Sequence, residues 1–166
     1  LSEGDIDIAK KTFVEINFIS GDADIFLETT SDKYDLVILK AVLEHVENPL
    51  NFINLITRVL SKNGILHFEL PNNNSLTSIV RKISPKISYD YGFIQPPMHL
   101  RAYTKKTLNY LLDNNGYQVK SIFTCGNNNS TWGQIRNYTN TQKALYSFSS
   151  MIKMGSLLVG IAKNNN

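Results

Sequence analysis

The segment from Tyr34 to Pro71 constrains the fold more than any other part of this 166-residue chain. It begins with a near-continuous apolar run at residues 35–39, a pattern typical of a strand that is covered on both faces. The dipeptide Asn48-Pro49 then suits the cap and first position of a helix, and a second apolar strand is predicted at residues 65–70. A strand, a helix and a strand over this length predict a parallel crossover, and ligands of such sheets bind beyond the carboxyl ends of the strands.

The helix inside this crossover is amphipathic. Its apolar side chains recur at helical spacing, and Gly64 is expected to end the helix in the left-handed conformation. The residues expected on the buried stripe are Leu50, Ile53, Ile56, Val59 and Leu60.

The rest of the chain also alternates between helical and extended patterns. We expect helices at residues 1–13, 73–83, 104–115 and 142–154, the last with an apolar face of Leu145, Phe148, Met151 and Ile152. We expect strands at residues 16–20, 117–123 and 156–163.

Composition narrows the class of protein. A length of 166 residues, 42% of them hydrophobic, predicts one domain spanning residues 1–166 with a sizeable core. A net charge of +3 without a basic run argues against a nucleic-acid partner. No apolar stretch is long enough for a membrane span, and the single cysteine, Cys125, fits a reducing compartment, so a cytoplasmic location is expected. Oligomeric state is not predicted.

Several short motifs, in order and at consistent spacing, resemble class I S-adenosylmethionine-dependent methyltransferases over roughly residues 1–125. The motifs are Asp35–Leu39, Leu43-Glu44-His45-Val46, Asn48-Pro49, Asn63-Gly64, Pro71-Asn72, Gly21-Asp22-Ala23 and His99-Leu100-Arg101. The resemblance implies an α/β fold with a Rossmann-like, mostly parallel sheet and helices on both faces.

One part of the family pattern is missing. None of the nine glycines forms the glycine-rich loop that holds the methionine end of the cofactor, and the acidic residue for the ribose hydroxyls is absent. On the resemblance, Leu1 falls just after the second family strand. We therefore expect an N-terminally truncated fragment that lacks the first two family strands.

The resemblance also implies a set of contacts to S-adenosyl-L-methionine. Asp22 would accept a hydrogen bond from the adenine amino group, although an Asp in a turn or a helix cap is the plain alternative. Lys40 is expected to contribute its backbone more than its side chain to the cofactor site. A solvent-exposed surface charge is an equally good explanation of this lysine. The expected cofactor residues are Asp22, Ala23, Leu39, Lys40, Ala41 and Glu44.

The Glu44-His45 pair admits two interpretations. A neutral imidazole at the carboxyl end of a strand can accept a proton from a nucleophile, and His99 is a second candidate for that role. Alternatively, the pair holds the architecture of the cofactor site, because the family carries it whatever the substrate.

A second polar group follows the later strand. Asn72, His99, Arg101 and Tyr103 are candidate substrate contacts, although the last three equally well tie the preceding loop to the helix at residues 104–115. No metal site is expected, because three scattered histidines and one cysteine match no compact ligand spacing.

The function implied is methyl transfer to a small-molecule, lipid or glycan nucleophile, with residues 127–154 as a lid insertion over the substrate. Two alternatives stay open. One is another nucleotide-binding α/β enzyme, such as a dehydrogenase, and the other is a non-catalytic relic that keeps the sheet without the cofactor.

Overall fold

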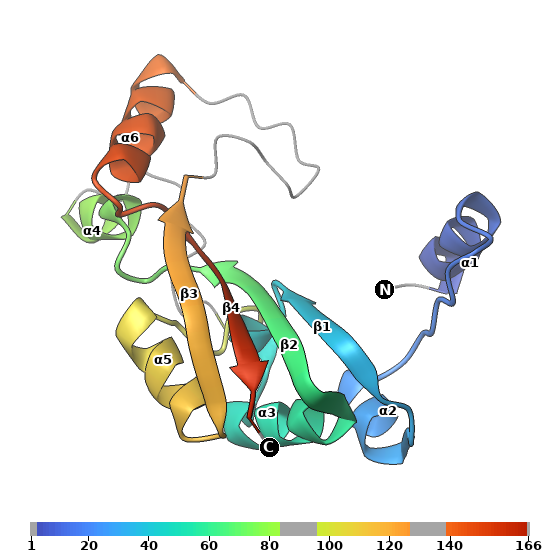
Figure 1. Ribbon diagram of the computed structural model, residues 1–166. Coiled ribbons are helices and arrows are strands. Elements are labelled where there is room, and N and C mark those ends of the chain that lie inside the picture. The colour runs from blue at the N-terminus through green and yellow to red at the C-terminus, as the bar shows by residue number, and fades with distance from the viewer. Residues whose placement is uncertain (1–2, 84–95, 127–138, 166) are drawn as a thin grey trace. The chain divides into compact units, whose positions relative to one another are not determined.

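A computed structural model describes residues 3–83, 96–126 and 139–165 (Figure 1). The chain divides into two compact units, Leu1–Asp32 and Lys33–Asn166. Residues 127–138, the first part of the predicted lid, lie outside the described residues.

The described part of the first unit is helical. Helix α1 spans Glu3–Thr12, which confirms the helix expected at residues 1–13, and α2 spans Ala23–Thr29. The strand expected at residues 16–20 is wrong, because this stretch forms no strand and its Ile16 and Ile19 are exposed. A strand needs a neighbour to complete its backbone hydrogen bonds, and the described part of this unit contains no other strand.

The second unit is built on a four-stranded sheet of order β1-β2-β4-β3. Strands β1 and β2 are parallel, as the crossover predicted, and β4 runs antiparallel to both β2 and β3. Three of the four strands therefore point the same way, which confirms the mostly parallel Rossmann-like class (Figure 1). The strands are β1 (Tyr34–Lys40), β2 (Leu60–Pro71), β3 (Tyr117–Cys125) and β4 (Leu157–Asn164).

The helices of the second unit begin at residues that suit helix starts. Asn48 caps α3 by accepting from the N–H of Asn51, and Pro49 is its first residue. Thr104 and Thr107 form a reciprocal capping box on α5. The helices are the 3₁₀ turn η1 (Leu43–His45), α3 (Pro49–Val59), α4 (Leu76–Ile83), α5 (Lys105–Asp113) and α6 (Asn140–Met151).

One face of the sheet forms the core with the helices. Phe68 at the centre of β2 is fully buried, and a Cβ on its neighbour Gly160 would lie 2.7 Å from its ring and 2.3 Å from the Ser121 carbonyl oxygen. Only glycine fits at that position of β4. The other core residues of strands and helices include Leu66, Leu70, Leu158 and Ala162 together with Ile53, Ile56, Leu108 and Leu112.

The opposite face of the sheet is partly exposed in the described structure. Leu36 and Ile38 of β1 are 52% and 60% exposed, and only Leu39 of the predicted buried run is buried. The prediction that β1 is covered on both faces is therefore wrong. As an edge strand with one neighbour, β1 buries only the side that faces the helices.

Three local predictions are also corrected. Leu50 lies on the exposed side of α3, whereas the other residues of the expected stripe are buried. Asn63 rather than Gly64 takes the left-handed conformation (φ 64°), and Gly64 lies within β2. Asparagine tolerates positive φ because its short polar side chain hydrogen-bonds locally. Helix α3 ends at Val59, and Leu60 caps it in an extended conformation, so neither Asn63 nor Gly64 ends the helix.

Helix α6 buries a different face from the one expected. Phe148 and Met151 are exposed, whereas Tyr146 and Ser149 are buried. Helix α6 packs against α4 beyond the carboxyl ends of β2 and β3 (Figure 1), and both buried residues lie on one side of the helix. Periodicity identified the helix but not its buried face.

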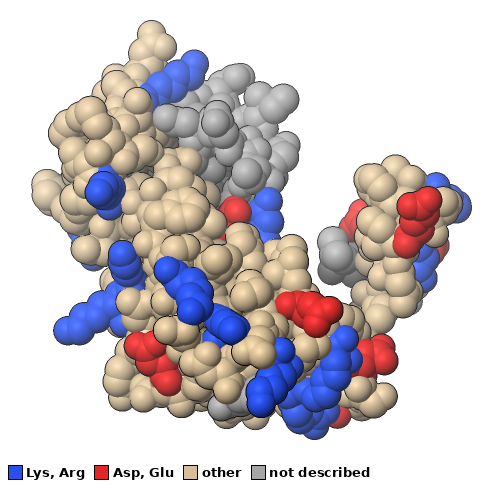
Figure 2. Space-filling model, viewed as in Figure 1, with Lys and Arg blue, Asp and Glu red and all other residues tan. Residues whose placement is uncertain are grey.

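On the viewed face of the second unit, Lys and Arg side chains gather over its lower part, with a few Asp and Glu side chains beside them (Figure 2). Among the described residues, no helix combines the length and the apolar character that crossing a membrane requires.

Candidate functional site

The carboxyl ends of β1 and β2 lie side by side, with Lys40 paired to Glu69 in the last register position. The next residue, Ala41, donates its N–H to the carbonyl of Glu69 (2.8 Å) and adopts a left-handed φ of 53°. A non-glycine residue held there costs on the order of 1 kcal/mol, and such residues cluster at functional sites. The chain thus turns sharply at the end of β1, where the resemblance places the cofactor.

Glu44 lies in η1, directly after this turn. It is only 1% exposed, yet neither carboxylate oxygen has a hydrogen-bond partner within the described part of the chain. Burial raises the pKa of the carboxyl above its usual value, opposed by its own backbone N–H and by His45 and His99. A buried carboxylate without hydrogen bonds is costly, so this position is not explained by stability.

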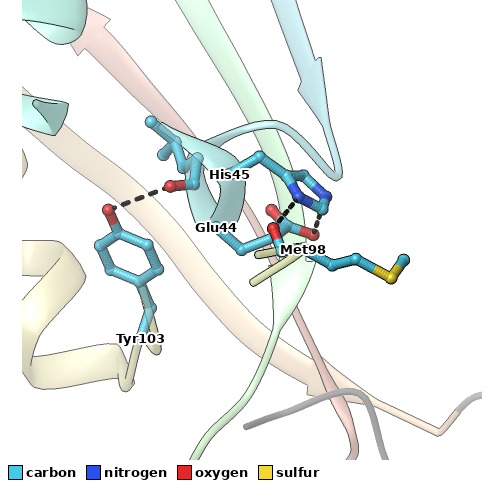
Figure 3. A network of polar contacts seen from close by, with 5 residues as sticks. Glu44, His45, Met98 and Tyr103 are labelled. Carbon is cyan, nitrogen blue, oxygen red and sulfur yellow. Dashed lines mark hydrogen bonds and ion pairs between the residues drawn. The ribbon is translucent and has the colours of Figure 1, made fainter. Parts of the chain in front are cut away.

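A second segment is fastened to η1 through the backbone. The carbonyl of Glu44 accepts from the N–H groups of Leu100 (2.8 Å) and Arg101 (3.0 Å), and the hydroxyl of Tyr103 donates to the carbonyl of Leu43 (3.3 Å; Figure 3). These bonds bring residues 98–103 against the loop that follows β1.

His45 is oriented by this segment. Its Nδ1 lies 2.5 Å from the carbonyl oxygen of Met98, which can only accept, so Nδ1 carries the proton. Its Nε2 faces Oε1 of Glu44 at 3.9 Å (Figure 3). The ring also meets that of His99 edge to face, with centroids 5.0 Å apart. Nε2 therefore points at a buried acid.

Glu44, His45 and His99 thus form one cluster, in which one ligand atom from each residue lies within 4.8 Å of the others. All three residues were candidate site residues in the sequence, but no metal site was expected, because the histidines and the cysteine match no compact ligand spacing along the chain. Spacing along the chain does not show this cluster, because it depends on the backbone bonds between η1 and residues 100–101. The signal available was the order of the Glu-His and His-Leu-Arg motifs.

Arg101 and Tyr103 flank the cluster. The guanidinium of Arg101 donates to the carbonyl of Glu47 (2.6 Å), which ties the segment to the start of α3. Burial raises the pKa of Tyr103 to about 12, lowered in part by Arg101 and raised further by Glu44. Both side chains hold the segment in place, in keeping with the structural alternative, and their substrate role stays a prediction.

Asn72 follows β2 and is fully engaged. Its amide nitrogen donates to the carbonyl of Gly155 (2.8 Å), and its amide oxygen accepts from the N–H of Asn74 (3.0 Å). Its own N–H donates to the carbonyl of Ser156. The side chain is 3% exposed, and its contact with substrate stays a prediction.

The remaining predicted cofactor residues lie in two places. Asp22, in the first unit, caps α2 by accepting from the N–H of Asp24 (2.8 Å), and Ala23 is the first residue of that helix. In the second unit, Leu39 is buried and Lys40 is exposed at the end of β1. The cap is the plain alternative for Asp22, and its adenine contact stays a prediction.

Comparison with known proteins gives a consistent family. Residues 3–122 match the family model of the methyltransferase domain. No curated protein sequence matches the chain.

Three solved structures share the fold. A SAM-dependent methyltransferase from Archaeoglobus fulgidus is 21% identical, with 95% of this chain and 72% of that chain covered and a TM-score of 0.58. A possible histamine N-methyltransferase from Thermotoga maritima is 18% identical (99% and 70% covered, TM-score 0.61). The plantazolicin methyltransferase, solved with SAH, is also 18% identical (99% and 66% covered, TM-score 0.60). Because the family model covers most of the chain, this protein belongs to the methyltransferase domain family.

Proposed function

We propose that this domain transfers the sulfonium methyl group of S-adenosyl-L-methionine to a nucleophile on a small molecule, a lipid or a glycan. The observation that carries the proposal is the loop after β1, where a left-handed Ala41 precedes a buried, unsatisfied Glu44 in a chain of the methyltransferase family. The fold is also that of enzymes described as SAM-dependent, one of them solved with SAH.

The cofactor would lie along this loop. The turn of Ala41 exposes backbone groups at the end of β1, between the buried Leu39 and the buried Glu44, where the sugar or amino-acid part would bind. Asp22 and the N–H of Ala23 would hold the adenine ring. The position of the loop after β1 agrees with the general rule that ligands bind beyond the carboxyl ends of parallel strands.

The chemistry required of the protein is modest. The sulfonium supplies an electrophilic methyl carbon, so the protein's tasks are to align the acceptor and to exclude water. His45 is held by Met98 through Nδ1, which leaves Nε2 as the accepting nitrogen of the neutral ring, so either this nitrogen or His99 would take the proton that the nucleophile loses.

The acceptor would approach from the side of residues 98–103. Asn72, Arg101 and Tyr103 lie along this side, and α4 and α6 pack together beyond the strand ends (Figure 1). We propose that residues 127–154, which include α6, form a lid over the acceptor. We further propose that the domain works in the cytoplasm without a nucleic-acid partner.

Calorimetric titration with S-adenosylmethionine tests the proposal, on these 166 residues and, where the coding sequence continues upstream of Leu1, on the chain extended by it. We expect a dissociation constant on the micromolar scale for the extended chain and much weaker binding for the shorter one, which lacks a glycine-rich loop. Glu44→Gln should weaken S-adenosylmethionine binding about tenfold, which corresponds to the loss of one hydrogen bond. The exposed neighbour Glu47 offers a matched control, Glu47→Gln.

The outcomes separate the alternatives. Binding to neither chain would contradict the proposal and favour the non-catalytic relic. Binding of a nicotinamide dinucleotide in place of S-adenosylmethionine would favour a dehydrogenase.

A further inference from the structure

We propose that Glu44, His45 and His99 form a binding site for a divalent transition-metal cation, with Zn²⁺ as the best match to the ligands. Two imidazoles and one carboxylate are a recurrent ligand set for zinc, which leaves further coordination positions open. The site stands on these three side chains alone and does not depend on the proposed methyl transfer.

The first support is the state of the Glu44 carboxylate. It is 1% exposed, and both oxygens lack a hydrogen-bond partner within the described residues. Buried charges in proteins are paired, hydrogen-bonded or bound to metals. The ring of His45 approaches Oε1 of Glu44 to 3.9 Å, which is beyond hydrogen-bonding distance. A cation between the two residues would satisfy an acid that the protein leaves unsatisfied.

The second support is the orientation of His45. Its Nδ1 donates to the carbonyl of Met98, so Nε2 presents a lone pair toward Glu44 (Figure 3). Metal-binding histidines almost always donate their other ring N–H to a carbonyl or carboxylate, which fixes the tautomer and the ring plane. The Met98 carbonyl supplies that outer contact.

The third support is the spacing of the ligand atoms. They lie within 4.8 Å of one another, and Nε2 of His45 lies 3.9 Å from Oε1 of Glu44. Two ligand atoms about 2.1 Å from a tetrahedral ion lie roughly 3.4 Å apart. Closing from the observed separations requires movements of about 1 Å or less, and His45 is on the exposed side, where its side chain has room.

The third ligand is positioned by backbone bonds. His99 is 7% exposed and immediately precedes Leu100, whose N–H is held by the Glu44 carbonyl. His99 thus cannot drift from Glu44 without breaking that bond. Backbone bonds thus hold the segments of Glu44 and His99 together, although 54 residues separate them in the sequence. His45 is the ligand whose side chain would move.

The test is calorimetric titration of the metal-free protein with Zn²⁺, with Mg²⁺ and Mn²⁺ in parallel, followed by thermal unfolding with and without Zn²⁺. We expect one equivalent of Zn²⁺ bound more tightly than Mg²⁺, and a higher melting temperature in its presence. Glu44→Gln, His45→Asn and His99→Asn should each weaken Zn²⁺ binding at least tenfold.

The chain supplies its own controls. His67, on the sheet away from the cluster, is the only other histidine, and Cys125 is the only cysteine. His67→Asn and Cys125→Ser should bind Zn²⁺ as the unchanged protein does. The proposal is overturned if Zn²⁺ does not bind, or if binding survives the three ligand substitutions, or if it is lost with His67 or Cys125.

These readouts use no methyl donor, so they are scored separately from the proposed function, although the two proposals share Glu44, His45 and His99. S-adenosylmethionine binding without Zn²⁺ binding would contradict the metal site alone. Zn²⁺ binding without S-adenosylmethionine binding would contradict the methyl-transfer proposal alone.

Discussion

Two loops follow adjacent parallel strands, and they differ in how they treat their polar side chains. After β2, Asn72 and the buried Ser75 and Ser78 bond to one another or to the backbone. After β1, Ala41 is held in a left-handed conformation, and neither carboxylate oxygen of the buried Glu44 has a hydrogen-bond partner among the described residues. The loop after β2 therefore serves the fold, and the loop after β1 is arranged for a ligand.

The difference follows from what each loop must hold. Asn72 bonds to Gly155 and Asn74, so it links the end of β2 to the start of β4. Glu44 uses its carbonyl to hold residues 100 and 101 but leaves its carboxylate unused. Backbone hydrogen bonds hold the loop after β1 in place, and the carboxylate of Glu44 stays available for chemistry.

The largest expected effect is on the loop after β2. Asn72→Ala removes two side-chain hydrogen bonds and leaves the Gly155 carbonyl unpaired, so the free energy of unfolding should fall by about 2–3 kcal/mol. Urea denaturation measures it. The exposed Asn74 provides the control Asn74→Ala, expected to change little. A loss below about 0.5 kcal/mol for Asn72→Ala would contradict the structural role of this loop.

Tyr103 connects the two loops, because its hydroxyl donates to Leu43 and its carbonyl accepts from Asn73. Its pKa is raised to about 12, so the folded state favours the neutral hydroxyl. The resulting stability is fully present below about pH 10, the ordinary tyrosine value, and is lost as the pH rises toward 12.

We therefore expect a loss on the order of 2 kcal/mol in the free energy of unfolding across that range, and a smaller loss in Tyr103→Phe. Denaturation at pH 9, 10, 11 and 12 measures it, with Tyr110→Phe at an exposed tyrosine as the control. Identical pH dependence in the Tyr103→Phe protein would show that this hydroxyl is not buried as described.

The loop after β1 should respond in the opposite direction. In the metal-free protein at pH 7, Glu44→Gln replaces a buried, unsatisfied acid by a neutral side chain, so the free energy of unfolding should stay level or rise by about 1 kcal/mol. Chemical denaturation in the presence of a chelator measures it. A loss of 2 kcal/mol or more would mean that the carboxylate has a stabilising partner, and the contrast with Asn72 would fail.

The smallest effect concerns the turn itself. Ala41→Gly removes the cost of a positive φ, so a gain of about 0.5–1 kcal/mol in the free energy of unfolding is expected. Asn63 has nearly the same conformation and tolerates it better, so Asn63→Gly should gain less. Equal responses at the two positions would indicate that Ala41 stores no strain.

The sequence predicted the crossover well because its signals are local. Asn48-Pro49 and Thr104 mark helix starts by their own chemistry, and the parallel pairing of β1 and β2 follows from the intervening helix. Burial was predicted less well. Leu36 and Ile38 are apolar, as in a strand that is buried on both faces, but their exposure depends on which elements pack against that face of the sheet.

The candidate site was predicted in its members but not in its geometry. Glu44, His45 and His99 were each identified, whereas their meeting depends on long-range backbone bonds that periodicity does not reveal. Asn72 shows the reverse case. Its position at a strand end predicted a ligand contact, but the structure shows that its amide already has partners at both ends.

The most direct test of the contrast between the two loops is an amide NMR titration with S-adenosylmethionine, on the form of the protein that binds it in calorimetry. We expect the changes in amide chemical shift to be concentrated at residues 39–45, with the amides of residues 75–78 nearly unchanged. Shifts concentrated after β2, with residues 39–45 unaffected, would contradict the assignment of the loop after β1 to the ligand and of the loop after β2 to the fold.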